Sequence, residues 1–208
     1  MHEYEKQLED IKQIRSMMED STRFVSLSGL SGIGAGFVAL IGAFFTYNYL
    51  EKQEIYQWGA SVYGNASREQ LFDLIGIAML ILLAAIAISS VFTIRRTKKE
   101  GKEIWSRPTQ RLLLNLIIPL AAGAIFCVQL AWYGHPGHVA PATLLFYGLA
   151  LMNAGKYTLR EVRYLGISEI GLGLLAGMMP GYGIIFWAIG FGLLHILYGA
   201  IMYYKYER

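Results

Sequence analysis

The residues best suited to chemistry in this chain are a few polar side chains set inside long apolar stretches. Glu169 is an acid within one such stretch, and His195 lies in the middle of another. Asn115, Asn153 and Ser31 lie within three more. A charged side chain at the centre of a bilayer costs on the order of 3 kcal/mol on insertion scales, and such groups often mark ion pathways or proton relays. These five residues are therefore the predicted ion- or ligand-binding site.

Helix rise places Glu169 about 10 Å from the cytoplasmic end of its apolar stretch and His195 near the middle of its own. We hypothesise that the polar groups line a cavity open to the cytoplasm, with Glu169 as its charged centre and a carrier of a proton or cation. Two alternatives remain open. Glu169 could pair with Arg160 or Arg163 and anchor a helix end, and His195 could be a neutral imidazole bonded to a neighbouring helix.

Six apolar stretches predict the elements that position these residues. The chain has 208 residues, of which 55% are hydrophobic and 16% are charged, whereas soluble domains have about 25% charged residues. About 20 helical residues cross a bilayer core of about 30 Å. The predicted spans of this all-α membrane protein are 24–47, 71–94, 112–133, 139–157, 162–179 and 183–204, followed by a cytoplasmic tail at 205–208. The span at 162–179 is the weakest because it is short and contains Glu169.

The distribution of Lys and Arg predicts the orientation of these spans. Lys52 and Arg68 lie between the first two spans, while the other cationic residues lie in the termini, in the 95–111 gap and around 156–163. Because positive loops stay in the cytoplasm, both termini are expected there. The net charge of +3 is too small to suggest nucleic-acid binding. The expected setting is a lipid bilayer, and the absence of a signal-peptide pattern favours a bacterial inner membrane.

Two spans share a glycine-rich motif that suggests an internal repeat. Residues 29–39 read GLSGIGAGFVA and residues 166–176 read GISEIGLGLLA, with six identical positions. Tyr147-Gly148 and Tyr198-Gly199 give spans four and six a looser likeness. The pattern predicts three parallel helical hairpins, formed by spans one–two, three–four and five–six, although glycine-rich spans can also resemble each other by chance. Small residues let helix backbones approach, so spans one and five should each pack closely.

The segment before the first span predicts a short amphipathic helix in the cytoplasm. Within residues 1–23, apolar side chains recur every three or four positions, as in a helix with one apolar stripe. The stripe consists of Tyr4, Leu8, Ile11, Ile14 and Met18. It could form a homo-oligomer contact with a second copy, or it could dock on the basic 95–111 loop of its own chain.

These features favour a small transporter or channel for an ion or small solute. The alternative is a non-catalytic membrane sensor, assembly partner or lipid-binding scaffold. The sequence has no nucleotide-binding loop, no zincin motif and no Ser-His-Asp order, so an enzyme is the less favoured class. No catalytic residue, metal site or cofactor is expected.

Overall fold

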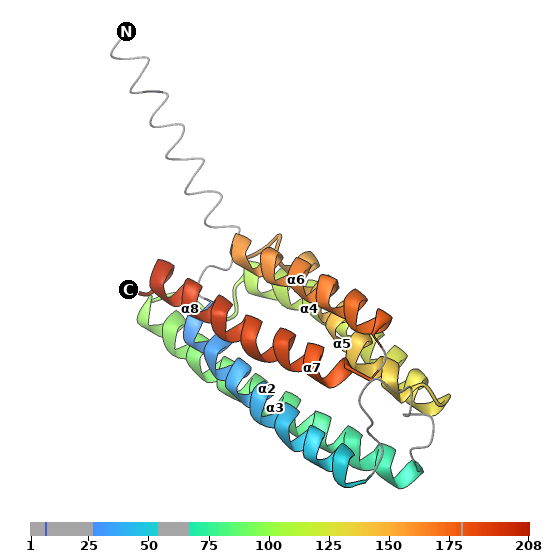
Figure 1. The fold of residues 1–208 in the computed structure, drawn as a ribbon. Helices are drawn as coiled ribbons and strands as arrows, with labels where there is room; N and C mark the ends of the chain where they lie inside the picture. Colours follow the sequence, from blue (N-terminus) through green and yellow to red (C-terminus); the bar gives the residue numbers. More distant parts are fainter. Residues whose placement is uncertain (1–6, 8–26, 54–66, 180) are drawn as a thin grey trace.

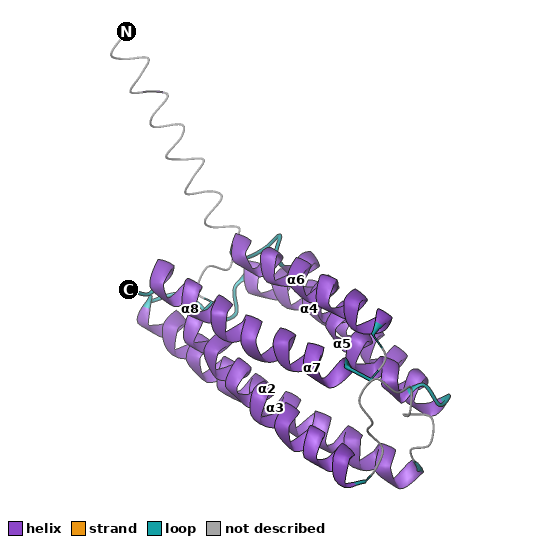
Figure 2. Ribbon diagram, in the orientation of Figure 1, coloured by secondary structure: helices purple, strands orange, loops and turns teal. Residues whose placement is uncertain are grey.

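The computed structural model describes residue 7 and residues 27–53, 67–179 and 181–208. The predicted amphipathic helix at 1–23, with its stripe of Tyr4, Leu8, Ile11, Ile14 and Met18, lies outside the described residues. Over the described ranges the protein is all-helical, as predicted, and its helical segments correspond to the six apolar stretches (Figure 2).

The last of the described helical segments contains a π-helical turn. The last helical segment runs without interruption through three parts. The elements are α2 (Gly29–Lys52), α3 (Arg68–Lys99), α4 (Arg107–Trp132), a 3₁₀ turn (Pro136–His138), α5 (Val139–Ala154), α6 (Arg160–Met178), α7 (Gly183–Trp187), the π-helix η3 (Ala188–Leu194) and α8 (His195–Tyr206). The sixth helix thus includes Lys205 and Tyr206, which were predicted to lie in the tail.

Serine caps explain where the two long central helices begin. Ser67 accepts a hydrogen bond from the backbone of Gln70, and the Gln70 side chain bonds back to Ser67, which forms a capping box for α3. Ser106 caps α4 through the backbone N–H of Thr109, with Pro108 in the first turn. These local signals extend α3 and α4 beyond the apolar stretches that predicted them.

Four helical segments are long and apolar enough to cross a membrane. They are Gly29–Lys52, Arg68–Lys99, Arg107–Trp132 and Gly183–Tyr206. With 16 and 19 residues, α5 and α6 are roughly 24 Å and 28 Å long, slightly short of a bilayer core. Large apolar side chains on α3 and α4 face outward, for example Leu80 (69% exposed) and Ile118 (67% exposed). This arrangement is compatible with a multi-pass membrane protein.

The helices form two groups of three (Figure 1). One group contains α2 packed against α3 and α8, and the other contains α5 packed against α4 and α6. Spans one–two and three–four therefore pair as predicted. The expected close pairing of spans five and six is not the main contact of either: α6 packs chiefly on α5, and α8 chiefly on α2. The physical reason is that the glycine-rich faces make their close backbone contacts inside each group, between α2 and α8 and between α6 and α5.

Glycines bring the backbones of α2 and α8 into direct contact. A Cβ atom built at Gly199 would lie 2.5 Å from the carbonyl oxygen of Gly29 and 2.6 Å from the nitrogen of Ile33. One built at Gly36 would lie 2.7 Å from the carbonyl oxygen of Gly192. Since real Cβ contacts are longer than 3 Å, only glycine fits at these positions. Close packing of span one is confirmed.

The same contact recurs between α6 and α5. A Cβ atom at Gly148 would lie 2.7 Å from the carbonyl oxygen of Gly166, and one at Gly173 would lie 3.0 Å from that of Pro141. Gly166 and Gly173 match Gly29 and Gly36 of the repeated motif, while Gly148 matches Gly199. The sequence repeat is therefore also a repeat of contacts, but it relates the pair α2–α8 to the pair α6–α5 and not three hairpins.

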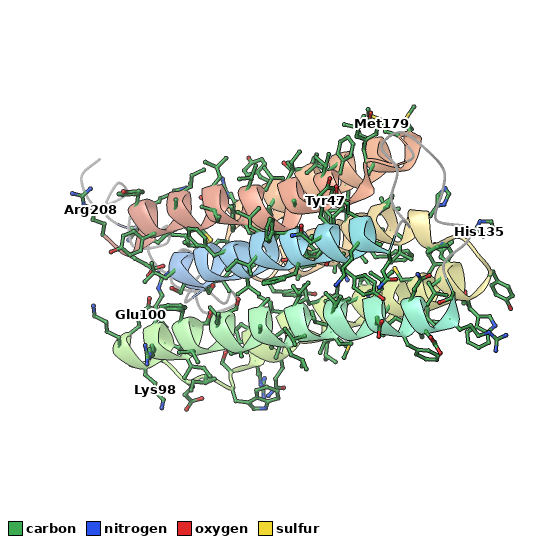
Figure 3. The ribbon with its side chains drawn as sticks, turned by 60° about the horizontal axis from the view of Figure 1, so that its bottom comes forward. Tyr47, Lys98, Glu100, His135, Met179 and Arg208 are labelled. Carbon is green, nitrogen blue, oxygen red and sulfur yellow. The ribbon has the colours of Figure 1, made fainter. Side chains whose placement is uncertain are left out.

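Charged groups gather at one end of the bundle. Lys98, Glu100 and Arg208 lie there, whereas His135 and Met179 lie at the opposite end (Figure 3). We call the end with Lys98, Glu100 and Arg208 the basic end. The last turn of α3, with its Lys and Arg side chains, and the first turn of α4 lie there. The C-terminus lies at this end (Figure 1).

Candidate functional site

The polar side chains of the last two helices meet where the two groups of helices touch. On α6, residues that recur every four positions face α8: Glu161, Leu165 and Glu169, all of them buried. On α8, the matching face carries His195, Tyr198, Met202 and Lys205. Glu169 lies next to His195 and Glu161 is bonded to Lys205. The two helices therefore run antiparallel along this seam.

Glu169 is enclosed by protein. Its side chain is 0% exposed, and neither carboxylate oxygen has a hydrogen-bond partner among the described residues. The nearest ionisable group is the imidazole of His195, whose Nδ1 lies 3.5 Å from Oε1 of Glu169. Gly190 leaves room for the carboxylate, because a Cβ atom there would overlap Oε2. The carboxyl thus sits in a tight space with a single imidazole beside it.

His195 is held by two hydrogen bonds that fix its tautomer. Nδ1 lies 2.9 Å from the carbonyl oxygen of Gly190, and Nε2 lies 2.8 Å from the Tyr147 hydroxyl. A carbonyl oxygen accepts only, so Nδ1 carries the proton, and neutral Nε2 accepts from Tyr147. Gly190 belongs to η3, five residues before His195. The π-helical turn therefore supplies the carbonyl that orients the imidazole, and π-bulges are frequent at functional sites.

The structure brings together Glu169 and His195, while the other predicted site residues make hydrogen bonds to other groups. Asn153 donates to the backbone oxygen of Asn115 at 3.1 Å. The Ser31 hydroxyl donates to the backbone carbonyl oxygen of Ser28, three residues earlier in the sequence. These hydrogen bonds do not involve Glu169 or His195, and the cavity lined by all five residues stays a prediction. The sequence also placed Glu169 and His195 at different depths, whereas they are neighbours.

The arginine alternatives for Glu169 do not apply. Arg160 and Arg163 have exposed side chains, while the buried carboxylate is paired with His195. The alternative for His195, a bond to a neighbouring helix, is met by Tyr147 on α5. Sequence reasoning did not predict Tyr147 as a site residue. Its place beside Gly148, in the motif shared with Tyr198-Gly199, was the signal that pointed to it.

A second polar group on this seam lies at the basic end, outside the predicted span at 162–179. Glu161 accepts hydrogen bonds from the Lys205 ammonium and, at 2.8 Å, from the Tyr206 hydroxyl. Burial opposes the charged form of Glu161, but the bonds from Lys205, its own backbone and Tyr206 outweigh it, and the pKa of this carboxyl is lowered. The ion pair was not predicted from the sequence.

This lowered pKa predicts acid sensitivity. The stabilisation from Glu161 is present above the unfolded-state pKa of about 4.3 and is lost as the pH falls through the lower pKa of the folded protein. Glu161→Gln should therefore reduce the fall in melting temperature in detergent between pH 5 and pH 3. Glu103→Gln, at an exposed carboxylate, is the control. Equal acid sensitivity in wild type and Glu161→Gln would contradict the role of this ion pair.

A third polar cluster joins the ends of three helices. Arg96 on α3 bonds to the carboxylate of Glu207 at 3.1 Å and to the carbonyl oxygen of Leu27. Glu207 in turn accepts from the backbone N–H of Gly29 and from Ser28. A carboxylate at this position caps the first turn of α2, where the unpaired N–H groups and the helix dipole favour negative charge.

The described residues thus hold one enclosed acid–imidazole–phenol group at the seam and two ionic groups near the basic end. Comparison of the chain with protein-family models, curated proteins and solved structures gave no match.

Proposed function

We propose that this protein moves protons across a membrane and that Glu169 and His195 form its proton-binding centre. The observation that carries the proposal is the Glu169 carboxyl, which is buried with both oxygens lacking hydrogen-bond partners among the described residues. An ionised carboxylate left unpaired in a low-dielectric interior costs several kcal/mol. Binding of a proton or cation removes that cost, so the site favours an ion.

The donor set favours a proton over a metal ion. Glu169 and His195 supply two ligating groups, whereas zinc sites use three or four and hard cations such as Ca²⁺ take six to eight oxygens. Nδ1 of His195 carries a proton of its own, which occupies the nitrogen nearest to Glu169. A carboxyl and an imidazole at 3.5 Å are a common pairing for exchange of a proton.

The position of the site also supports transport. Glu169 and His195 lie near the middle of their helical segments, where the α6–α5 pair meets the α2–α8 pair. In many transporters, ion sites lie near the bilayer midplane, at the interface of internal repeats and beside interrupted helices. Here the repeat is the glycine contact, and the interruption is the π-helix η3.

The membrane frame of the proposal keeps the six-span arrangement. We propose that α5 and α6 cross the bilayer with the four longer segments. Both pack against other helices of the bundle, and their 16 and 19 residues are only a few short of the about 20 that a span needs. The basic end then faces the cytoplasm together with both termini, as the positive-inside rule requires. A bacterial inner membrane remains the expected location.

Proteoliposomes test the proposed function. The wild-type protein should admit protons when a potassium diffusion potential makes the lumen negative, as read by an internal pH-sensitive dye. Glu169→Gln keeps the size of the side chain but removes the titrating carboxyl, so proton uptake should fall at least tenfold. Glu103→Gln, at an exposed carboxylate, should leave uptake unchanged. Equal uptake in Glu169→Gln and wild type would refute Glu169 as the proton-binding centre. Wild-type uptake no greater than that of protein-free liposomes would refute transport and leave the sensor or scaffold alternative.

A further inference from the structure

Two buried oxygen atoms between Glu169 and the basic end have no hydrogen-bond partner among the described residues. They are the hydroxyl of Tyr198 and Oε2 of Glu161. Buried polar atoms in proteins are nearly always paired, so two orphans on one seam need an explanation. Tyr198 lies on α8 between His195, which is next to Glu169, and Lys205, which is bonded to Glu161.

Helix geometry agrees with this placement. Tyr198 follows His195 by three residues and precedes Lys205 by seven, which is about 4.5 Å and 10.5 Å along α8. On α6, Glu161 and Glu169 are eight residues apart, or about 12 Å. The acids on α6 and their partners His195 and Lys205 on α8 thus mark the two ends of a short segment, with Tyr198 inside it.

The surroundings of this segment are apolar. Tyr147 and Tyr198 both pack against a cluster formed by Leu151, Val162 and Leu165. Tyr147 and Tyr198 also occupy matching positions of the repeat, next to Gly148 and Gly199. The repeat thereby places one phenol from each pair of helices against the same apolar cluster.

We propose that protons reach Glu169 from the basic end through Glu161 and Tyr198. This inference rests on the proposed function. A proton taken up by Glu161 Oε2 passes by a bridging water to the Tyr198 hydroxyl, which releases its own proton by a second bridging water to the Tyr147 hydroxyl. Tyr147 donates its proton to Nε2 of His195, and Nδ1 gives up its proton to Glu169. Each hydroxyl gains one proton and loses one, so the relay ends with a protonated carboxyl and a neutral imidazole whose proton has moved from Nδ1 to Nε2. The imidazole must return to its Nδ1–H tautomer before the next proton passes.

The aromatic side chains on the far side of His195 offer no continuation of the proton path, so the path has a single entrance. Beyond His195, the ring of Phe191 stacks at 5.8 Å, and the ring of Trp187 lies 4.9 Å from that of Phe191. These rings carry no acid or hydroxyl that continues the relay along η3 and α7. Entry by way of Glu161 is therefore the route that the side chains support, and release toward the other end requires η3 to change its packing.

Tyr198→Phe tests the relay with little change of shape. It removes the hydroxyl alone, and we expect proton uptake in the liposome assay to fall at least tenfold while the melting temperature in detergent stays within about 2 °C. Tyr204→Phe, at a side chain that is 65% exposed, is the matched control and should retain full uptake.

Glu161 provides a second, independent measurement. Glu161→Gln should lower uptake at least fivefold, whereas Glu161→Asp, which keeps a titrating carboxyl, should retain more of it. A merely structural ion pair would not separate these two variants in flux once their melting temperatures are matched.

The outcomes separate this inference from the function on which it rests. If Glu169→Gln abolishes uptake while Tyr198→Phe and Glu161→Gln stay within twofold of wild type, the relay is wrong and the proton-binding centre stands. If Glu169→Gln has no effect, both fall. Loss of uptake in all three variants, with Tyr204→Phe unaffected, supports both.

Discussion

Gly199→Ala is expected to lower the melting temperature of the protein in detergent by about 5 °C or more. The added methyl group would lie 2.5 Å from the carbonyl oxygen of Gly29 and 2.6 Å from the nitrogen of Ile33. Both are backbone atoms that no side-chain rotation can move away, so α2 and α8 must separate. Overpacking of this kind typically costs 1–3 kcal/mol, and each kcal/mol shifts the melting temperature of a protein of this size by about 2–4 °C.

Gly171→Ala is the matched control for this substitution. Gly171 belongs to the same repeated motif, but a Cβ atom there would have nothing within 4 Å. Because alanine favours helix more than glycine does, by about 1 kcal/mol, the melting temperature of Gly171→Ala should not fall. Gly36→Leu, which pushes a larger side chain against Gly192 and Ile196, should be worse than Gly199→Ala. An unchanged Gly36→Leu variant would remove the claim that glycine contacts hold the groups together.

Arg96→Met is expected to destabilise the bundle by about 3–5 kcal/mol, the usual result when one partner of a buried ion pair is removed. The side chains of Arg96 and Glu207 are only 11% and 13% exposed. Loss of the guanidinium removes the donor of the Leu27 carbonyl and the cationic partner of the Glu207 carboxylate, which keeps only its neutral donors Ser28 and the Gly29 N–H. Thermal unfolding in detergent, followed by circular dichroism, measures the change.

Two further variants isolate the ionic contribution. Arg95→Met removes a neighbouring arginine with an exposed side chain and should change stability by less than about 1 kcal/mol. Glu207→Gln in the Arg96→Met background removes the unpaired charge and should recover part of the loss. A double variant less stable than Arg96→Met alone would show that Glu207 acts mainly as the cap of α2.

Much of the fold was accessible from the sequence because lipid-compatible helices have a simple signature. The six apolar stretches correspond to six helical segments, and the glycine motif marks the two closest helix contacts. The partners of that motif were not predicted correctly. Glycines permit close approach by any helix that presents a matching face. The presence of Gly36 therefore does not tell whether α2 packs against α8 or against α6.

The site was predicted in part. Glu169 and His195 stand out because such side chains are costly at membrane depth. Their contact depends on how far α6 and α8 are shifted along their axes relative to each other. The glycine contacts within each pair of helices set this shift. Counting residues from the ends of the predicted spans does not reveal it. Asn115, Asn153 and Ser31 instead donate hydrogen bonds to backbone carbonyl oxygens. The Arg96–Glu207 pair joins residues far apart in sequence, and no local pattern indicates it.

The pairing of α2 with α8 has a consequence for biogenesis. The ribosome adds roughly 5–20 residues per second, so the glycine face of the first span waits on the order of ten seconds before its partner is synthesised. The α5–α6 pair, by contrast, is complete as soon as both neighbours have emerged. A nascent chain stalled before Gly192 would hold an unpaired backbone surface in the bilayer, where a quality-control protease or an insertase could recognise it.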